Sequence, residues 1–350
     1  MPEITEAELK KQIEKADFAR FYFLYGEEKY LVGYYARRIV GKAGAEGPRD
    51  FNLQKFDGGE TGVDEIASAV EALPVMAERK CVAVANLDAN ALRGAEAEKL
   101  WELLGDLPET CVLVVYALSF DFDERRDKNW KKFLAKANEA GVTVPFRRLT
   151  EARLEKLVCD GAEKRGCEMT RRNAARMLGL CGSDMQTALN ELEKLCAYAG
   201  GGEITAEEVD LLTVKNLEAR VFDLSKAIMA GNSDGAYAIL GQLFYQNEEP
   251  VAILAVLSGA YLDLYRVKTA LQSGCTALEP AKYFDYARKE FRLKNAGYNA
   301  KRYSDEMLRQ CLGALLDADV ALKSARGDRR LILEKLIAQL IWITEKEKMP

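Results

Sequence analysis

Residues 21–30 have the pattern of a buried strand, a turn at Gly26 and a helix, which is where a P-loop keeps its phosphate cradle. A working P-loop needs the spacing G-x-x-x-x-G-K-[ST]: glycines let backbone N–H groups surround the phosphates, the lysine neutralises charge and the hydroxyl binds Mg²⁺. Here Glu27 and Glu28 follow Gly26, and no Gly-Lys-Ser/Thr run follows nearby. Because two carboxylates would repel a triphosphate, the segment predicts an ATPase-like shape without a nucleotide site.

Other residues that nucleotide or metal chemistry would use are absent from the sequence as well. The third predicted strand ends in Asn86-Leu87-Asp88, without the Asp-Glu pair that an active ATPase of this shape needs. The chain has no histidine, which removes the commonest general base, His-dependent triads and the usual zinc sites. The 8 cysteines stand singly, as reduced thiols that fill a core do. We therefore expect no catalytic residue, no cofactor and no metal.

Length and charge limit the classes of protein to which the chain can belong. Its 350 residues predict two or three domains, and its 49% hydrophobic and 30% charged residues are typical of a soluble globular protein. The net charge of -5 provides no global field toward nucleic acid, so any DNA contact must be local. The acidic N-terminus is unlike a signal peptide, and the apolar stretch 251–264 falls short of a membrane span. We expect a cytoplasmic protein with no membrane segment, which the reduced cysteines also fit.

Short apolar runs alternate with helical patterns over residues 18–148. This alternation predicts a parallel sheet flanked by helices. The expected strands and the helices between them are listed in chain order: 21–25, 30–40, 51–56, 63–73, 81–87, 95–104, 112–116, 128–137 and 142–146. The first domain is therefore predicted to be α/β, over residues 1–148.

The strand pattern stops after Leu149, and the rest of the chain is predicted to be helical. Capping residues open four helices, at Thr150, Thr170, Ser183 with Asp184, and Thr205, and predict a small bundle over residues 149–213. In its third helix the predicted inner face carries Leu189, Leu192 and Leu195, which leaves Glu191, Glu193 and Lys194 for solvent or a neighbouring subunit. A second helical domain, 214–350, is expected from amphipathic segments at 219–230, 233–245, 250–271, 305–323 and 328–345.

Six short motifs follow one another in an order that resembles one family. They begin at Gly26-Glu-Glu, Leu73-Pro-Val-Met-Ala-Glu-Arg-Lys, Gly182-Ser-Asp-Met-Gln-Thr-Ala-Leu, Ala219-Arg-Val-Phe-Asp-Leu, Glu249-Pro-Val-Ala-Ile-Leu and Leu315-Leu-Asp-Ala-Asp-Val. Each motif alone is weak, but together their order and spacing cover nearly the whole chain and are specific. The chain resembles the delta subunits of the bacterial DNA polymerase III clamp loader.

The resemblance implies an AAA+ architecture, α/β plus all-α: an ATPase-like domain with a degenerate P-loop, a helical lid bundle and a helical collar domain. The helix start Ser183-Asp184-Met185-Gln186 lacks the Arg that would sense nucleotide in active AAA+ relatives. Delta subunits have no nucleotide site of their own; they grip the ring-shaped sliding clamp (beta) and hold one of its interfaces open for loading on primer-template DNA during replication. The implied partners are the clamp, the ATPase subunits gamma and tau, delta-prime through the collar, and the DNA.

The residues Leu73, Val75 and Met76 are the predicted clamp-binding element. The helix that begins at 63 should end near Leu73, because Pro74 restricts the residue before it, and the next strand begins at about Lys80. Val75 and Met76 then lie on a connection, where apolar side chains have less reason to be buried. The resemblance assigns an adjacent bulky pair here to a pocket on the clamp. The family often has a Leu-Phe type of pair, so Leu73 remains a candidate anchor, and the alternative is that Val75 and Met76 cap the domain's own core.

Two basic groups, at 125–132 and 323–330, are candidates for phosphate contact. Neither has the dense aromatic residues of a single-strand stacking platform, and a solvated face is the alternative for both. The resemblance favours the second group, in which the possible DNA contacts are Lys323, Arg326, Arg329 and Arg330. The helices of the last domain carry more apolar positions than one narrow stripe needs, which would fit assembly with other subunits or a core of their own.

Three classes of function compete. The first is a clamp-opening subunit that is not itself an enzyme, although it belongs to a DNA polymerase holoenzyme. The second is a non-catalytic DNA-binding replication scaffold. The third is an AAA+ ATPase, which the missing P-loop and the missing acidic pair disfavour. We expect the first, because the order of motifs and the degenerate nucleotide site support it independently.

Overall fold

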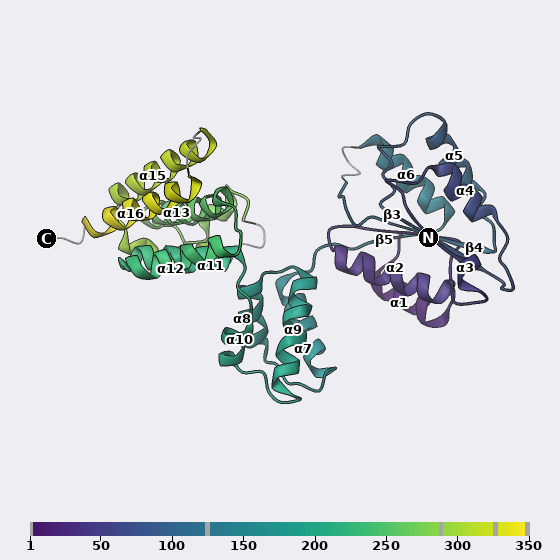
Figure 1. Cartoon of the computed structure of the whole chain (residues 1–350), viewed down its shortest axis with the longest axis horizontal. Coiled ribbons are helices and arrows are strands. Elements are labelled where there is room, and N and C mark those ends of the chain that lie inside the picture. Colours follow the sequence, from purple (N-terminus) through teal and green to yellow (C-terminus); the bar gives the residue numbers. More distant parts are fainter. Residues whose placement is uncertain (1–2, 123–126, 287–289, 325–327, 347–350) are drawn as a thin grey trace. The chain divides into compact units, whose positions relative to one another are not determined.

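The computed structural model describes residues 3–122, 127–286, 290–324 and 328–346 (Figure 1). Contacts between residues divide the chain into two compact units, Met1–Leu149 and Thr150–Pro350. Hydrophobic residues of the second unit form two separate clusters, one in its first helices and one in its last. The predicted boundary between a lid and a collar domain at 213/214 remains a prediction.

The first unit is built on a 5-stranded parallel sheet, with the strand order β2-β3-β4-β1-β5. The strands are β1 Phe21–Tyr25, β2 Leu53–Asp57, β3 Lys80–Ala85, β4 Cys111–Tyr116 and β5 Val142–Pro145. The predicted parallel sheet is therefore confirmed. The strand β1 lies between β4 and the edge strand β5, so that Phe23 pairs with Val115 on one side and Thr143 on the other. Near-continuous apolar strands are expected where helices cover both faces of a sheet.

Helices cover both faces of this sheet (Figure 1). One face is covered by α2 Lys29–Ala43, on which α1 Glu6–Lys15 packs; the other is covered by α4 Val63–Glu71, α5 Ala95–Gly105 and α6 Lys128–Ala140. The core on the second side is aromatic: Phe23 stacks on Trp130 at 6.0 Å between ring centroids and meets Phe133 edge-on at 4.9 Å. This core fixes the strands whose ends carry the candidate sites.

Four local features of the first unit differ from the sequence prediction. The helix α1 was not predicted, although Thr5 and Glu8 form the capping box that opens it. The strand expected at 51–56 begins at Leu53, because Phe51 and Asn52 belong to the short helix α3 Arg49–Asn52. The helix α4 ends at Glu71 rather than 73, and β3 ends at Ala85 rather than 87. Both early ends lengthen the connections that carry candidate site residues.

The second unit opens with α7 Glu151–Glu163, α8 Arg171–Cys181, α9 Met185–Ala199 and α10 Ala206–Leu212. Each begins at a predicted cap, since Thr150, Thr170, Asp184 and Thr205 accept hydrogen bonds from backbone N–H groups of the first turn. The prediction for Glu191 was wrong: its side chain is buried, and its Oε2 accepts from Val214 N at 3.0 Å and pairs with Lys194 at 2.5 Å. Helical periodicity could not show that the chain after α10 returns to this carboxylate.

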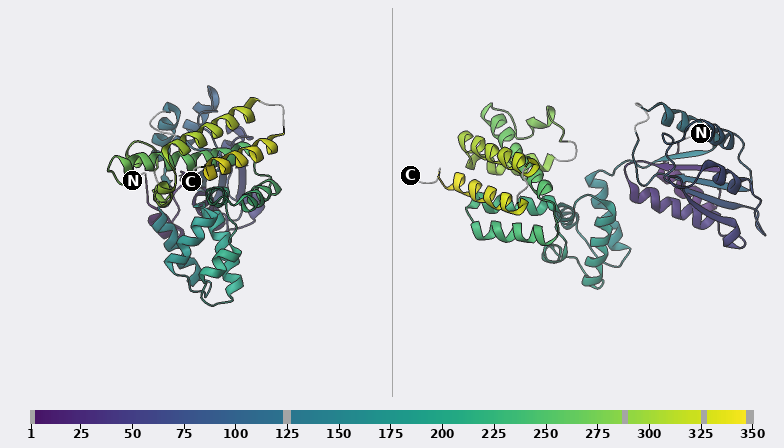
Figure 2. Two further views of the ribbon diagram at one scale, coloured as in Figure 1. Left: turned by 90° about the vertical axis from the view of Figure 1, so that its left-hand side faces the viewer. Right: turned by 45° about the horizontal axis from the view of Figure 1, so that its top comes forward.

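The remaining helices of the second unit are α11 Leu217–Ala230, α12 Ser233–Tyr245, α13 Pro250–Gln272, α14 Glu290–Asn299, α15 Asp305–Ser324 and α16 Arg329–Lys346. The short 3₁₀ turns Glu279–Lys282 and Ala300–Arg302 flank α14. The helices α15 and α16 lie side by side (Figure 2). The five predicted segments are confirmed, whereas α14 was not predicted.

The helix α13 is, by length and composition alone, long and apolar enough to cross a membrane, unlike the expectation for 251–264. Its apolar face, with Leu257 and Tyr261, instead lies in the hydrophobic cluster of the last helices. Its buried Asp263 accepts hydrogen bonds from Tyr286 at 2.5 Å and from Arg292 at 2.8 Å. A helix that packs against neighbours and carries a buried ion pair is a core helix of this unit.

Candidate functional site

The turn after β1, where a P-loop would hold phosphates, is bonded to the end of β5. Gly26 has φ 124°, and a Cβ at this position would overlap the carbonyl oxygen of Phe146. The Phe146 N–H donates to the Tyr25 carbonyl at 2.7 Å, and the Glu28 N–H donates to the Phe146 carbonyl at 3.0 Å. Glu28 is also buried. The residue that follows β5 therefore packs directly against the backbone of this turn.

The first lysine after Gly26 is also engaged within the chain. Lys29 Nζ lies 2.7 Å from Asp121 Oδ1 and donates to the carbonyl oxygens of Phe120 at 2.5 Å and Ala117 at 3.3 Å. All three acceptors lie on the segment that follows β4. The ammonium group of Lys29 therefore binds a neighbouring loop. In a P-loop, the charge of the lysine would instead bind phosphate.

Asn86, the residue after β3, ties two further segments to the carboxyl edge of the sheet. Its Oδ1 accepts from the Leu118 and Ser119 N–H groups at 3.0 Å each, and its Nδ2 donates to Asp57 Oδ2 at 3.3 Å. Asn86 has φ 56°, a left-handed conformation that asparagine tolerates better than most residues. An amide thus joins loops at the position where an active ATPase would place acidic residues toward a metal.

The loop 72–79 between α4 and β3 carries the predicted clamp-binding residues. Leu73 is 78% exposed and Met76 is 88% exposed, whereas Val75 is 39% exposed. The exposure of Met76 contradicts the alternative that Val75 and Met76 cap the domain's own core. Leu73 and Met76 are the two most exposed of the three residues, and Val75 is only partly exposed. Their exposure makes them the stronger candidate anchors of the three. Single exposed apolar residues are common, but two large ones three residues apart on an ordered loop form a surface that a partner can cover.

Buried polar side chains hold this loop at its middle and join the two elements that flank it. Asn52 Oδ1 accepts from the Val75 N–H at 2.7 Å, and Asn52 Nδ2 donates to the Val75 carbonyl at 2.7 Å. Lys80 is buried and donates to the Ala69 carbonyl in the last turn of α4, where a cation is favoured by the helix dipole. Burial lowers the pKa of Lys80. Sequence reasoning missed Asn52, whose only signal was an amide inside a predicted apolar strand.

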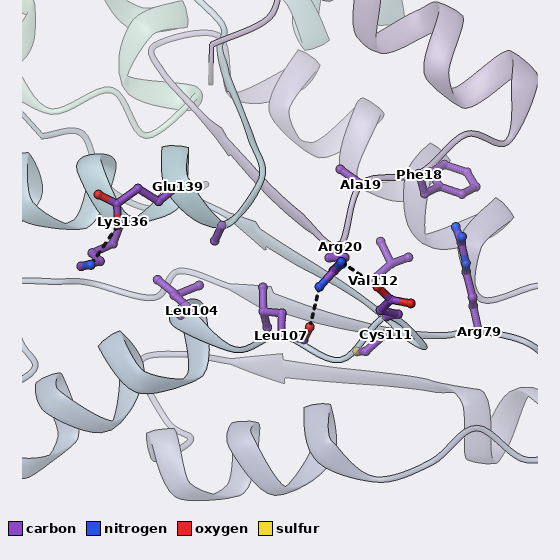
Figure 3. A pocket seen from close by; sticks show the side chains of 13 residues that line it. Phe18, Ala19, Arg20, Arg79, Leu104, Leu107, Cys111, Val112, Lys136 and Glu139 are labelled. Atoms are coloured by element: carbon purple, nitrogen blue, oxygen red, sulfur yellow. Dashed lines mark hydrogen bonds and ion pairs between the residues drawn. The ribbon is translucent and has the colours of Figure 1, made fainter. Parts of the chain in front are cut away.

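A cavity of about 720 Å³ opens at the opposite, amino-terminal edge of the sheet (Figure 3). Its charged lining residues largely pair with one another: Arg20 donates to Glu109 at 2.8 Å, and Lys136 lies 2.9 Å from Glu139. Figure 3 shows Arg20 also reaching the carbonyl of Leu107, at 3.4 Å. Ligands of parallel α/β sheets bind at the carboxyl ends of the strands, so the cavity is on the wrong edge for a nucleotide.

Three of the predicted DNA-contacting residues are described, Lys323 at the end of α15 and Arg329 and Arg330 at the start of α16. Lys323 pairs with Asp319 at 2.7 Å, and Arg330 pairs with Glu334 at 2.8 Å. The Arg329 side chain is exposed and makes no ion pair or hydrogen bond with any residue that the structure describes. Arg326 lies outside the described residues. Exposed ion pairs within one helix are weak, so all three described cations can reach an external anion.

The other basic group, 125–132, is only partly described. Arg125 and Arg126 lie outside the described residues, and Lys128 begins α6 after the cap Asp127. Lys132 lies over the Trp101 ring, 5.0 Å from its centroid. A cation that stacks on the domain's own aromatic residue fits the solvated-face interpretation better than a phosphate site.

Several large apolar side chains are exposed on the helices of the second unit. On α12, α15 and α16 they are Tyr237, Tyr245, Leu316, Val320, Leu331 and Trp342. These residues come in addition to the many that fill the hydrophobic cluster of the last helices. The described surface therefore offers apolar contacts of the kind that subunit assembly needs.

Comparison with known proteins gives consistent results along the chain. The model of the family "DNA polymerase III, delta subunit" matches residues 22–143, and the model of the C-terminal domain of the DNA polymerase III delta subunit matches residues 218–340. The DNA polymerase III subunit delta of Bacillus subtilis is 25% identical over 340 residues, which are 96% of this chain and 97% of the relative. That of Escherichia coli is 26% identical over 328 residues, 93% of this chain and 91% of the relative.

A solved structure agrees with these sequence matches. The structure of the Bacillus subtilis DNA clamp loader delta protein is similar with a TM-score of 0.58 and 25% sequence identity, covering 96% of this chain and 99% of that one. The predicted fold class, a parallel-sheet α/β domain followed by helical parts, is thereby confirmed. Two family models that match both ends of the chain, relatives that span it and a shared fold lead to one conclusion: the chain belongs to the DNA polymerase III delta subunit family, the delta subunits of the clamp loader.

Proposed function

We propose that this protein binds the sliding clamp through the loop 72–79 and opens one of the clamp's interfaces, so that the clamp can be loaded on primer-template DNA. The observation that carries the proposal is the exposure of Leu73 and Met76 on an ordered loop of the α/β domain. Val75, the third predicted residue, contributes through a partly exposed side chain and a fixed backbone. Soft, unbranched Met suits docking into a pocket of another protein.

The energetics of such an interface are sufficient for specific binding. Fully burying an exposed Leu or Met side chain contributes about 1.5–3 kcal/mol. Two such anchors three residues apart would form a hot spot, so the interface need not be large. Because a ligand shifts an equilibrium only by its differential affinity, the protein must bind the open or strained clamp interface more tightly than the closed one.

We further propose that the protein works without binding or hydrolysing ATP and is not by itself an enzyme. The proposal is supported by the bonds that engage the degenerate cradle: Gly26 packs on Phe146, Glu28 donates its N–H to Phe146, and Lys29 is paired with Asp121. A triphosphate that used the charge of Lys29 would have to compete with its bonds to Asp121 and to the segment after β4. The energy that exposes or covers the clamp-binding loop would then come from the ATPase subunits of the loader.

The second unit has the assembly role in this proposal. Its first helices, 149–213, would be a lid domain, and its last, 214–350, a collar that joins the gamma and tau ATPase subunits and delta-prime. The exposed apolar residues of α12, α15 and α16 support such contacts. The turn between α15 and α16, with Lys323, Arg329 and Arg330, would face primer-template DNA within the assembly, in the cytoplasm.

The experiment that tests the proposal loads sliding clamp on nicked circular DNA and follows its release by the purified chain, without ATP. The wild-type chain should release the clamp, and a chain with both Leu73→Ser and Met76→Ser should not. The matched control is Leu211→Ser in α10, which removes a similarly exposed leucine far along the sequence. Release that persists in the double variant would refute the site, and no release by the wild type would refute clamp opening.

A DNA-binding scaffold is the remaining alternative, and the same assay separates it from the proposal. A scaffold would bind primer-template DNA by itself and leave the clamp on the circle. Binding of ATP to the isolated chain at micromolar concentration, measured by calorimetry, would instead revive the ATPase alternative.

A further inference from the structure

The side chain of Asn52 is fully buried, and its amide forms hydrogen bonds with the backbone of the loop 72–79. Asn52 is 0% exposed, and its amide makes bonds of 2.7 Å to both the N–H and the carbonyl of Val75. Its Nδ2 also donates to the carbonyl of Glu46 at 3.1 Å. A buried polar group whose bonds are satisfied specifies one local conformation, because every alternative leaves a donor or acceptor without a partner. Asn52 therefore fixes the backbone in the middle of the loop.

A glycine brings a second segment against the same stretch of loop. Gly47 has φ 66°, and a Cβ added there would lie 2.7 Å from the Val75 carbonyl oxygen and 2.9 Å from that of Met76. These separations are shorter than real Cβ contacts allow, so a side chain at 47 would push the loop away. Only glycine satisfies both the left-handed backbone and the close approach.

Met76, the residue after Val75, has a strained backbone conformation. Met76 has φ 51°, in the left-handed region that residues with a side chain disfavour. Such conformations persist where the surrounding structure determines them, and they cluster at ligand-binding segments. Here the bonds from Asn52 to the preceding residue determine the entry into this turn, and the Met76 side chain leaves it 88% exposed.

We propose that Asn52 and Gly47 are positioning residues that hold the loop 72–79 in its clamp-binding conformation before the clamp arrives. This inference rests on the proposed function of the loop. Neither residue touches the clamp through its own side chain, because Asn52 is buried and Gly47 has none. A preformed loop avoids the loss of backbone and side-chain freedom that a mobile loop would suffer on binding. The clamp consequently meets Leu73 and Met76 already presented.

The first measurement needs no variant. In the free wild-type chain, the Val75 amide proton should exchange with solvent far more slowly than an exposed loop amide, because it is bonded to a buried side chain. Hydrogen exchange read by mass spectrometry or NMR gives this rate. Rapid exchange of the Val75 amide in the free chain would overturn the inference outright.

The second measurement compares clamp binding by variants. Asn52→Ala and Gly47→Ala should each weaken clamp binding about tenfold, mostly through faster dissociation, because the loop must then be ordered on binding. Exchange at Val75 should accelerate in both. Surface plasmon resonance with immobilised clamp gives the two rate constants.

Two controls separate positioning from general loss of stability. Asn173→Ala removes another buried asparagine bonded to a backbone carbonyl, that of Ile204 at 2.8 Å, in the second unit. Gly41→Ala adds a methyl group in α2 where nothing lies within 4 Å. Asn173→Ala should lower the melting temperature, and Gly41→Ala should keep or raise it. Both variants should leave the clamp dissociation rate unchanged.

The outcomes distinguish this inference from the proposed function. If the wild-type chain does not bind clamp, the proposed function fails. If the wild type binds, Leu73→Ser and Met76→Ser abolish binding, and Asn52→Ala or Gly47→Ala dissociates at the wild-type rate, the inference alone fails. Should Asn52→Ala not fold, the folded Gly47→Ala variant and the wild-type exchange rate decide the question.

Discussion

The ammonium of Lys29 lies 2.7 Å from a carboxylate oxygen of Asp121, beside the turn that would hold phosphates in an ATPase. The lysine also donates to two backbone carbonyls of the segment after β4. The charge that nucleotide chemistry would use thus connects two loops at the carboxyl edge of the sheet. This contact supports the proposal that the chain works without nucleotide chemistry.

Replacement of this lysine should therefore affect stability and not nucleotide binding. Lys29→Met should lower the free energy of unfolding by about 1–2 kcal/mol, because two backbone carbonyls lose a charged donor while the exposed Asp121 is solvated. Lys136→Met, which breaks an exposed pair within α6, should change it by less than about 0.5 kcal/mol. Urea unfolding gives both values. Loss of a measurable ATP affinity in Lys29→Met would contradict this interpretation.

The close contact of Gly26 with β5 predicts a larger effect. Gly26→Ala should destabilise the first unit by about 3 kcal/mol or more, since the new Cβ would overlap the Phe146 carbonyl and the backbone at φ 124° disfavours a side chain. The control Gly41→Ala meets open space inside a helix and should be neutral or stabilising by up to about 1 kcal/mol. Thermal unfolding of the two variants measures the difference, and equal melting temperatures would mean that Phe146 does not pack closely against Gly26.

The three predicted anchors should differ in their effect on clamp affinity. Leu73→Ser and Met76→Ser should each weaken binding about 10- to 100-fold, which corresponds to the transfer of one apolar side chain from water. Val75→Ser should weaken it less, because this side chain has less surface left to bury. All three should unfold within about 0.5 kcal/mol of the wild type, as expected for exposed positions. A titration of labelled clamp ranks them, and a dominant effect of Val75 would contradict the exposure argument.

The basic turn predicts a salt-dependent contribution to DNA binding by the assembled loader. Each phosphate contact that is lost should reduce the slope of log K against log salt by about 0.9. Arg329→Ala should produce this change, because Arg329 has no competing carboxylate among the described residues, whereas Lys323→Ala should produce less because Asp319 already pairs with it. Fluorescence anisotropy with primer-template DNA at several salt concentrations gives the slopes. An unchanged slope in the Lys323, Arg329 and Arg330 triple alanine variant would identify the turn as a solvated face.

The cysteines predict a pH dependence of stability. Burial raises the pKa of Cys81 to about 12 and that of Cys111 to about 11, from an ordinary value of 9.0. Below pH 9 both states keep these thiols protonated; above it the unfolded state loses the protons first, so the free energy of unfolding falls by up to about 1.4 kcal/mol per pH unit for each thiol. The slope of the free energy of unfolding against pH should be smaller in Cys81→Ala.

A thiol reagent at pH 8 should label exposed Cys275 first, and prompt labelling of Cys81 would contradict its burial.

Local signals in the sequence were sufficient to predict most of the helices and strands. The caps Thr150, Thr170 and Asp184 each open a helix as predicted, because a capping bond joins residues two or three positions apart. The five strands were found from their apolar runs, with errors of a few residues at their ends. The unpredicted helix α1 had its own signal in Thr5 and Glu8, which form a capping box.

Contacts between segments that are distant in the sequence could not be predicted from local signals. The prediction that Glu191 faces solvent was wrong because the chain returns to it 23 positions later, at Val214. Asn52 looked like part of a strand, yet its side chain serves Val75, also 23 positions away. Nothing in the composition or periodicity around Asn52 or Glu191 distinguishes them from solvated polar residues.

Three properties could be read from the residues alone: no glycine-lysine cradle follows Gly26, no acidic pair follows the third strand, and an α/β region precedes the helices. Those properties depend on residue identity and short-range pattern, which are visible without a fold. The folded structure was needed to see that Gly26 packs on Phe146 and that Lys29 pairs with Asp121. It was also needed to see that Leu73 and Met76 are exposed on a loop held by Asn52. The physical reason is that exposure and side-chain bonding to a remote backbone depend on how segments pack, which no local pattern encodes.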